Sequence, residues 1–253
     1  MKIAVLSSGS KGNSSFIESN NQAILIDAGL SAKRLLSRMD DVGADFKNLN
    51  GIVVTHDHSD HIKGVGILAR KLKIPIYIHE ANYNVKTDLF SNCEMKFITS
   101  EFELGGFKIT PIPVSHDGTA NYCYNIVADG KKISHLTDLG KATSLVMERT
   151  KDCDFFLLES NHDPMMLKEG PYPWYLKQRI SGSRGHLSNA DASNLLLSAD
   201  RSNLKNIILA HLSDENNDPR LAFESMLATI EENNLDINVQ VALQTQALEF
   251  IEV

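Results

Sequence analysis

Cysteine is scarce in this sequence: Cys93, Cys123 and Cys153 are its three thiols, and no two of them lie at CxxC spacing. The odd number and wide separation argue against a disulfide framework and a zinc ribbon. Long apolar runs are also missing. The run 155–158 has four residues, whereas a membrane helix needs about 20, and residues 1–6 lack the apolar core of a signal peptide. We therefore expect a cytoplasmic protein that does not enter the membrane.

An excess of basic residues is absent as well. The 253 residues include 25 Lys and Arg against 32 Asp and Glu, a net charge of −7, which argues against a sequence-independent duplex binder of the histone type. Nucleic acid is not excluded, because bound divalent metals would change the local sign of the charge. No internal repeat, low-complexity tract or long linker divides the chain, and we expect one domain over residues 1–253.

Short apolar runs alternate with segments of helical periodicity. The runs predict strands over residues 3–6, 23–26, 52–55, 122–127, 132–137, 240–243 and 247–251. Asp129-Gly130 predicts a hairpin. Helical spacing predicts helices after Ser31, from Asp60 to Leu72, around residues 192–199 and after Asp218-Pro219. Strands on both sides of helices indicate an α/β architecture of packed sheets covered by helices.

The histidines are concentrated in one place. Residues 56–61 (His-Asp-His-Ser-Asp-His) directly follow the strand predicted over 52–55. In an extended chain His56 and His58 point the same way, and a helix that begins at Asp60 and His61 folds a second pair back toward the first. Imidazole and carboxylate without thiolate suit Zn²⁺, Mn²⁺ or Fe²⁺. The alternative is a solvated loop that is rich in histidine by chance, but the apolar strand before it argues against an exposed loop.

Further candidate ligands close other apolar strands. His116, Asp138 and His211 each stand at the carboxyl end of such a strand, where α/β folds build their sites. Asp27 ends the strand 23–26 and is expected to accept the second N–H of a ligand histidine. Considered alone, a histidine such as His116 or His211 is more often structural than a metal ligand. Both are taken as ligands here because they complete the set that two metal ions need. The predicted centre has two metals, one held by His56, His58 and His116, the other by Asp60, His61 and His211, with Asp138 bridging both.

The run 56–61, together with Asp27, His116, Asp138 and His211, resembles the five-motif pattern of the metallo-β-lactamase superfamily. The resemblance covers nearly the whole chain and implies a four-layer αββα sandwich with a two-metal site at one edge. It implies less about substrate, because lactamases, thioesterases, lactonases, phosphodiesterases and nucleases share this fold. Asp138 stands where β-lactam-hydrolysing members have Cys, which disfavours that branch. The interval from Asp138 to His211 is too short for the β-CASP insertion.

Residues 164–190 form a basic and aromatic excursion in an acidic chain. They contain four basic residues and one acidic residue, with Tyr172, Trp174 and Tyr175 between them. Basic side chains bind phosphates and aromatic faces stack on unpaired bases. The alternative is a structural excursion whose Trp and Tyr pack on the body of the domain. The candidate substrate contacts are Lys177, Arg179 and Arg184.

The excursion ends at a predicted helix N-terminus. Ser188 is a good N-cap with Asp191 three residues on, and the free N–H groups of such an end are a natural phosphate seat. Ser188 and Asn189 are therefore candidate substrate contacts. His186 stands just ahead of them and is a candidate general acid or phosphate contact. The alternative is a capped helix with a surface histidine.

Several segments in the same order resemble the YycJ/WalJ branch of the superfamily, and this resemblance implies a 5′-to-3′ DNA exonuclease. The matching segments are 8–13, 159–163, 172–173, 176–180, 185–189 and 211–217.

We therefore predict a two-metal phosphodiester hydrolase that acts on DNA, as duplex ends or a single strand. Two divalent ions, Zn²⁺ or Mn²⁺, would hold a bridging hydroxide, with Asp60 orienting it as well as binding metal. His186 is the candidate acid. The first alternative is a small-molecule hydrolase acting on a thioester, a lactone or a cyclic phosphodiester. The second is a metal-binding regulatory module without catalysis, against which the complete set of seven ligand positions argues.

Overall fold

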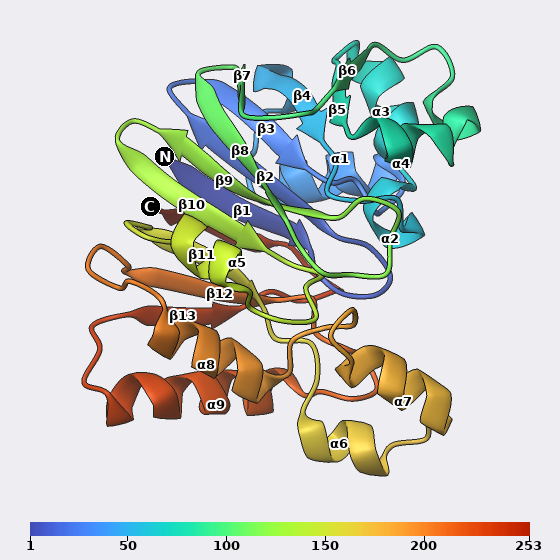
Figure 1. The fold of residues 1–253 in the computed structure, drawn as a ribbon. Helices are drawn as coiled ribbons and strands as arrows, with labels where there is room; N and C mark the ends of the chain where they lie inside the picture. Colours follow the sequence, from blue (N-terminus) through green and yellow to red (C-terminus); the bar gives the residue numbers. More distant parts are fainter.

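Two seven-stranded sheets lie face to face in the computed structural model, which describes residues 1–253 (Figure 1). The first sheet has, in spatial order, β14 (Leu248–Glu252), β1 (Lys2–Ser7), β2 (Ser14–Ser19), β3 (Gln22–Ile26), β4 (Leu49–Val53), β5 (Ile76–Ile78) and β6 (Met95–Phe97). The second has β13 (Asn238–Val241), β12 (Asn206–Ala210), β11 (Phe155–Glu159), β10 (Lys131–Leu136), β9 (Tyr122–Ala128), β8 (Phe107–Pro113) and β7 (Phe102–Leu104). Each sheet has three antiparallel pairings on one side and three parallel pairings on the other; the antiparallel ones come first in the order given for the first sheet and last in the order given for the second.

Helices cover the outer face of each sheet, which completes the four layers of an αββα sandwich (Figure 1). The first sheet carries α1 (Ala32–Asp41), α2 (Ser59–Ile62), α3 (Val65–Leu72) and α4 (Glu80–Asn84). The second carries α5 (Ser144–Arg149), α8 (Asn189–Ser198) and α9 (Pro219–Glu232), while α6 (Pro164–Glu169) and α7 (Trp174–Ser181) stand apart from α8 and α9. None of the helices combines the length and apolar composition needed to cross a membrane.

Alternation of side chains along the strands explains why the sheets are buried on both faces. In β3, Leu25 packs in the cluster under the helices, whereas Ile24 and Ile26 pack against the opposite sheet. In β11, Phe156 faces the helices and Phe155 faces the other sheet. Because successive side chains of a strand point to opposite faces, continuous apolar runs produce this arrangement.

The structure confirms most of the predicted elements and corrects one. Asp129 and Gly130 have φ of 52° and 70°, as a two-residue hairpin turn between β9 and β10 requires. The helix predicted from Asp60 to Leu72 is wrong as a single element, because it divides into α2 and α3 at Gly64. The Gly64 N–H donates to the carbonyl of Ala28 at 2.7 Å, and a Cβ at Gly64 would lie 2.1 Å from the Leu30 carbonyl oxygen. This contact with a distant loop replaces the helical continuation.

His135 lies between the two sheets and is structural. Its side chain is buried on β10, and its Nε2 lies 3.3 Å from the hydroxyl of Ser15 on β2. Burial lowers the pKa of His135 from 6.5 to about 4, because the imidazolium would be charged in the apolar interior.

We expect His135→Gln to flatten the pH dependence of stability between pH 6.5 and 4. As the pH falls, the unfolded wild-type chain takes up a proton at His135 at a higher pH than the folded protein does. The contribution of neutral His135 to the free energy of unfolding is therefore full above pH 6.5 and decreases as the pH falls toward 4. The loss is on the order of 3 kcal/mol. Urea unfolding at several pH values measures it, with His79→Gln as the matched control. Parallel curves for His135→Gln and the wild type would contradict the assignment.

Candidate metal centre

Three loops meet at the edge of the sandwich where β1, β3 and β4 end. The backbone N–H of Asn13 donates to the carbonyl of Asp60 at 2.7 Å, and the backbone N–H of Gly29 donates to the carbonyl of Asn13 at 2.9 Å. The N–H of Ala28 donates to the carbonyl of His61 at 2.8 Å. The histidine-rich run is therefore held by backbone contacts with the loops after β1 and β3.

The first cluster of the centre consists of His56, His58 and His116, whose candidate ligand atoms all lie within 4.8 Å of one another. His116 Nδ1 donates to the Gly185 carbonyl at 3.0 Å, which turns Nε2 toward the cluster, 3.3 Å from His58 Nδ1. His56 is buried, and its Nδ1 lies 3.0 Å from the Thr55 hydroxyl.

The second cluster consists of Asp60, His61 and His211, again within 4.8 Å. A buried carboxylate orients each histidine from behind. His61 Nδ1 donates to Asp27 Oδ2 at 2.7 Å, and His211 Nδ1 donates to Glu159 Oε1 at 2.9 Å. His211 Nε2 is thereby left for a cation, and His61 Nε2 lies 3.0 Å from the amide nitrogen of Asn13 and 3.5 Å from Asp60 Oδ2.

Asp138 lies between the clusters. It groups with His56 and His61, and its Oδ2 is 3.3 Å from His61 Nε2. Asp27, Asp138 and His211 share a backbone feature, since each has φ of 57° or 58° just after its strand. This left-handed conformation is uncommon for residues other than glycine and turns the chain sharply at the site.

The polar atoms of the centre fit divalent metal ions. His56 Nε2, His211 Nε2 and Asp138 Oδ2 are buried and have no hydrogen-bond partner. Buried polar atoms in native proteins are nearly always satisfied, and a coordinated cation would satisfy all three. The donor set of imidazoles and carboxylates without thiolate suits borderline divalent metals.

The electrostatics of the centre keep its carboxylates ionised. Burial opposes the charge of Asp60, but His61 and His211 outweigh it and hold the pKa of Asp60 below its ordinary range. Burial opposes a proton on His211 too, yet the surrounding carboxylates raise the pKa of His211 to about 10. Burial lowers the pKa values of His56 and His58. A metal must therefore displace a proton from His211, so metal binding should strengthen as the pH rises.

Glu159 belongs to the centre, whereas the sequence leaves open whether it lies near the metals or anchors a loop, and it is not among the predicted site residues. It is fully buried at the end of β11, and its Oε1 accepts hydrogen bonds from His186 Nδ1 at 2.8 Å and His211 Nδ1 at 2.9 Å. Burial opposes its charge, but His186 and His211 lower the pKa of Glu159 to about 2. Its position after an apolar strand is the same signal that identified Asp27 and Asp138.

The metal clusters open into a pocket of about 250 Å³ that α7 closes on one side. His186 lines it with its side chain 20% exposed, and so does Arg179, whose Nε donates to Asp117 Oδ2 at 2.5 Å. Arg184 lies near the His116 carbonyl at 3.4 Å. Lys177 is on another face of α7 and donates to the Lys168 carbonyl.

Two expectations about the excursion are corrected. Ser188 and Asn189 are buried and do not line the pocket. The Ser188 hydroxyl donates to Asp191 in a capping box, and Asn189 is bonded to Ser160 and Asn217, so both side chains are structural. The alternative in which Trp174 and Tyr175 pack on the body is also wrong, because they are 69% and 72% exposed.

The chain is similar in sequence and in fold to β-lactamase superfamily proteins. A model of the β-lactamase superfamily domain matches residues 22–211, and a metallo-β-lactamase-fold protein from Bacillus subtilis, YhfI, superposes with a TM-score of 0.73 over 98% of this chain and 99% of its own, at 18% identity. The chain belongs to this superfamily, whose fold implies divalent metal ions.

Within that superfamily, the similarity extends to particular nucleases. The chain is 36% identical over 247 residues to exodeoxyribonuclease WalJ of Streptococcus pneumoniae, covering 94% of this chain and 91% of the relative. It is also 36% identical over 242 residues to exodeoxyribonuclease YycJ of Bacillus anthracis, covering 94% and 92%.

Gly29→Ala is expected to disrupt the centre through a backbone clash. The added Cβ would lie 1.6 Å from the Asp60 carbonyl oxygen and 2.6 Å from the Asn13 nitrogen. We expect a loss of about 2–4 kcal/mol in the free energy of unfolding and a loss of bound metal. Gly43→Ala is the control, because its Cβ meets no atom within 4 Å and only the φ of +67° is unfavourable, which costs about 1 kcal/mol. Equal stability and metal content in the two variants would refute the clash.

Proposed function

We propose that this protein is a metal-dependent exonuclease that degrades DNA from its 5′ ends. The observation that carries the proposal is that the paired metal clusters and an arginine of α7, Arg179, line one pocket. The names of the WalJ and YycJ relatives, which match over almost the whole chain, support the same reaction.

The metal ligands in this proposal are those of the two clusters. His56, His58 and His116 would hold one ion, Asp60, His61 and His211 would hold the other, and Asp138, which lies between the clusters, would serve both. Zn²⁺ and Mn²⁺ both suit these donors. Divalent ions in such a pair acidify bound water and neutralise charge on a phosphate. Asp27 and Glu159 keep the second N–H of His61 and His211 occupied, which fixes the orientation of both rings.

His186 is the proposed proton donor to the leaving oxygen. Its Nδ1 is engaged with Glu159, so Nε2 is the nitrogen available to a substrate in the pocket. The hydrogen bond to Glu159 holds the ring with Nε2 free, and an imidazole is the side chain that most often serves as a general acid. The partial exposure of His186 leaves room for contact with substrate, in contrast to the buried His211.

The exposed aromatic and basic side chains of the excursion are proposed to hold the DNA. Arg179 reaches into the pocket, and Trp174 and Tyr175 present most of their surface to solvent. Aromatic faces stack on unpaired bases and arginine pairs with phosphate, so this surface suits a frayed or single-stranded end. Its net positive charge contrasts with the −7 of the whole chain.

Metal removal and reloading test the proposal directly. Protein stripped of metal and refilled with Mn²⁺ or Zn²⁺ is given linear duplex DNA labelled at the 5′ or the 3′ end. We expect metal-dependent release of nucleotides that begins at 5′ ends and falls at least about a hundredfold in His58→Ala and Asp60→Ala. His79→Ala, a histidine outside the clusters, is the control. Release that starts at 3′ ends would overturn the polarity, and full activity in Asp60→Ala would overturn the metal scheme.

A second experiment tests His186 as the acid. His186→Ala should slow DNA hydrolysis by about 10²–10⁴-fold, the usual contribution of general acid catalysis. Hydrolysis of bis(4-nitrophenyl) phosphate should fall much less, because 4-nitrophenolate leaves without a proton. Metal content is measured in parallel and is expected to match the wild type. An equal loss on both substrates would assign His186 to positioning instead of proton transfer.

A further inference from the structure

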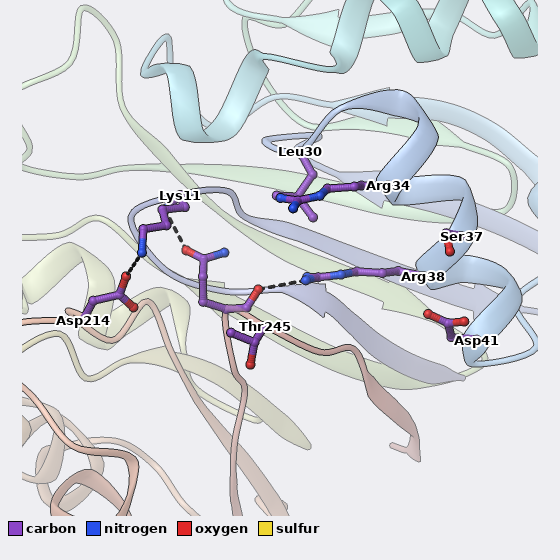
Figure 2. A pocket seen from close by; sticks show the side chains of 9 residues that line it. Lys11, Leu30, Arg34, Ser37, Arg38, Asp41, Asp214 and Thr245 are labelled. Atoms are coloured by element: carbon purple, nitrogen blue, oxygen red, sulfur yellow. Dashed lines mark hydrogen bonds and ion pairs between the residues drawn. The ribbon is translucent and has the colours of Figure 1, made fainter.

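A second cavity, of about 450 Å³, lies beside the metal pocket between α1 and the loops that begin at β1, β12 and β13 (Figure 2). Leu30 is its single apolar lining residue. The charged lining residues are three basic and two acidic: Lys11, Arg34, Arg38, Asp41 and Asp214. We refer to it as the basic cavity.

Two arginines of the basic cavity have no acidic partner. Arg34 and Arg38 lie one helical turn apart on α1 and extend side by side toward Lys11 (Figure 2). Neither guanidinium forms a salt bridge, whereas Lys11 is paired with Asp214 at 2.5 Å. Asp41 in the same cavity attracts Arg38 without forming a salt bridge with it, and a bound anion would relieve the repulsion that remains between the two arginines.

The position of Arg38 is fixed in advance of any ligand. Its Nη1 donates to the Leu6 carbonyl at 2.7 Å. Its Nη2 donates to the Gln244 carbonyl at 2.9 Å, the contact marked by the dashed line from Arg38 in Figure 2. Burial lowers the pKa of Arg38, and the neighbouring Arg34 adds to this shift while Asp41 opposes it. A cation already held in place loses little conformational entropy when an anion binds.

The basic cavity and the metal pocket share a thin wall. Ser10 lines the metal pocket and Lys11 lines the basic cavity; in the facing loop Ser213 and Asp214 are divided in the same way. Consecutive Cα atoms are only about 3.8 Å apart. On each side, therefore, two neighbouring residues of one loop line the two spaces, with no residue between them. Gln244 fixes this wall by accepting from the Lys11 N–H at 2.7 Å.

We propose that the basic cavity binds a phosphate group of the substrate strand next to the phosphate held at the metal centre. This inference rests on the proposed nuclease function. A nucleic acid strand carries a phosphate on every nucleotide, so a strand seated in the metal pocket extends a second phosphate over the shared wall toward Arg34 and Arg38. Guanidinium pairs with phosphate in a bidentate manner, and the exposed Lys11–Asp214 pair can open at little cost.

Arg34→Gln tests the proposal, because the Arg34 side chain is exposed and forms no ion pair or side-chain hydrogen bond, so its removal should not affect folding. Lys33→Gln is the matched control: it removes the same charge from the adjacent, exposed position of α1 outside the cavity. We expect Arg34→Gln to raise KM for duplex DNA about tenfold with little change in kcat, and to lower the salt dependence of binding by about one counterion. Lys33→Gln should match the wild type.

Substrates with a 5′-phosphate and with a 5′-hydroxyl distinguish the source of the phosphate. An effect confined to 5′-phosphorylated DNA identifies the terminal phosphate, and an effect on both identifies an internal phosphodiester; either supports the site. Identical behaviour of Arg34→Gln and Lys33→Gln on both substrates overturns it.

Binding of fluorescent DNA, measured in the His58→Ala background, separates this inference from the proposed function. DNA that is bound in an Arg34-dependent manner but never cut by the wild type would refute the nuclease and keep the phosphate site. DNA that is cut and bound without any contribution of Arg34 would refute the site and keep the nuclease.

Discussion

A fully buried carboxylate determines how one half of the centre is built. Glu159 ends β11 with no exposed surface, and a charge in that position is strongly destabilising unless hydrogen bonds replace its hydration. Five N–H groups do so, from the backbone of Asp138, Leu139 and Leu187 and the rings of His186 and His211. The loops after β10 and β12 and before α8 are therefore fixed relative to one another by the requirement to solvate one negative charge.

The first sheet has a counterpart in Asp27. This carboxylate ends β3, is also buried, and accepts from the Thr55 N–H at 2.8 Å, the Thr55 hydroxyl at 2.7 Å and His61 Nδ1 at 2.7 Å. Each sheet thus contributes one buried carboxylate that accepts a hydrogen bond from Nδ1 of a histidine of the second cluster and so orients its ring. The carboxyl ends of β3 and β11 reach the same edge of the sandwich, where the rings of His61 and His211 both approach Asp60.

The sequence predicts what depends on local periodicity and on strand ends. Apolar runs predict most of the strands, and His116, Asp138 and His211 are found because each follows such a run. The role of Glu159 escapes this reasoning, since its ring partners are distant in sequence and its five donors converge only in the folded chain. For Ser188 the local structure is predicted correctly, but the predicted contact with substrate is wrong. Its capping signal is right, but Ser188 forms a bridge with His162 that draws the helix end into the body of the protein, away from substrate.

The two strands that precede these carboxylates are each followed by a helix that carries arginines of the two cavities. β3 and Asp27 are followed by α1 with Arg34 and Arg38, and β11 and Glu159 are followed by α6 and then by α7 with Arg179. The constraint that orients the histidines therefore also sets where cations stand on either side of the centre. A small substrate needs contacts only within reach of the metals. Positive charge in two neighbouring spaces instead complements a chain whose negative charge repeats along its length, which is the property that separates a nucleic acid strand from a lactone or a thioester.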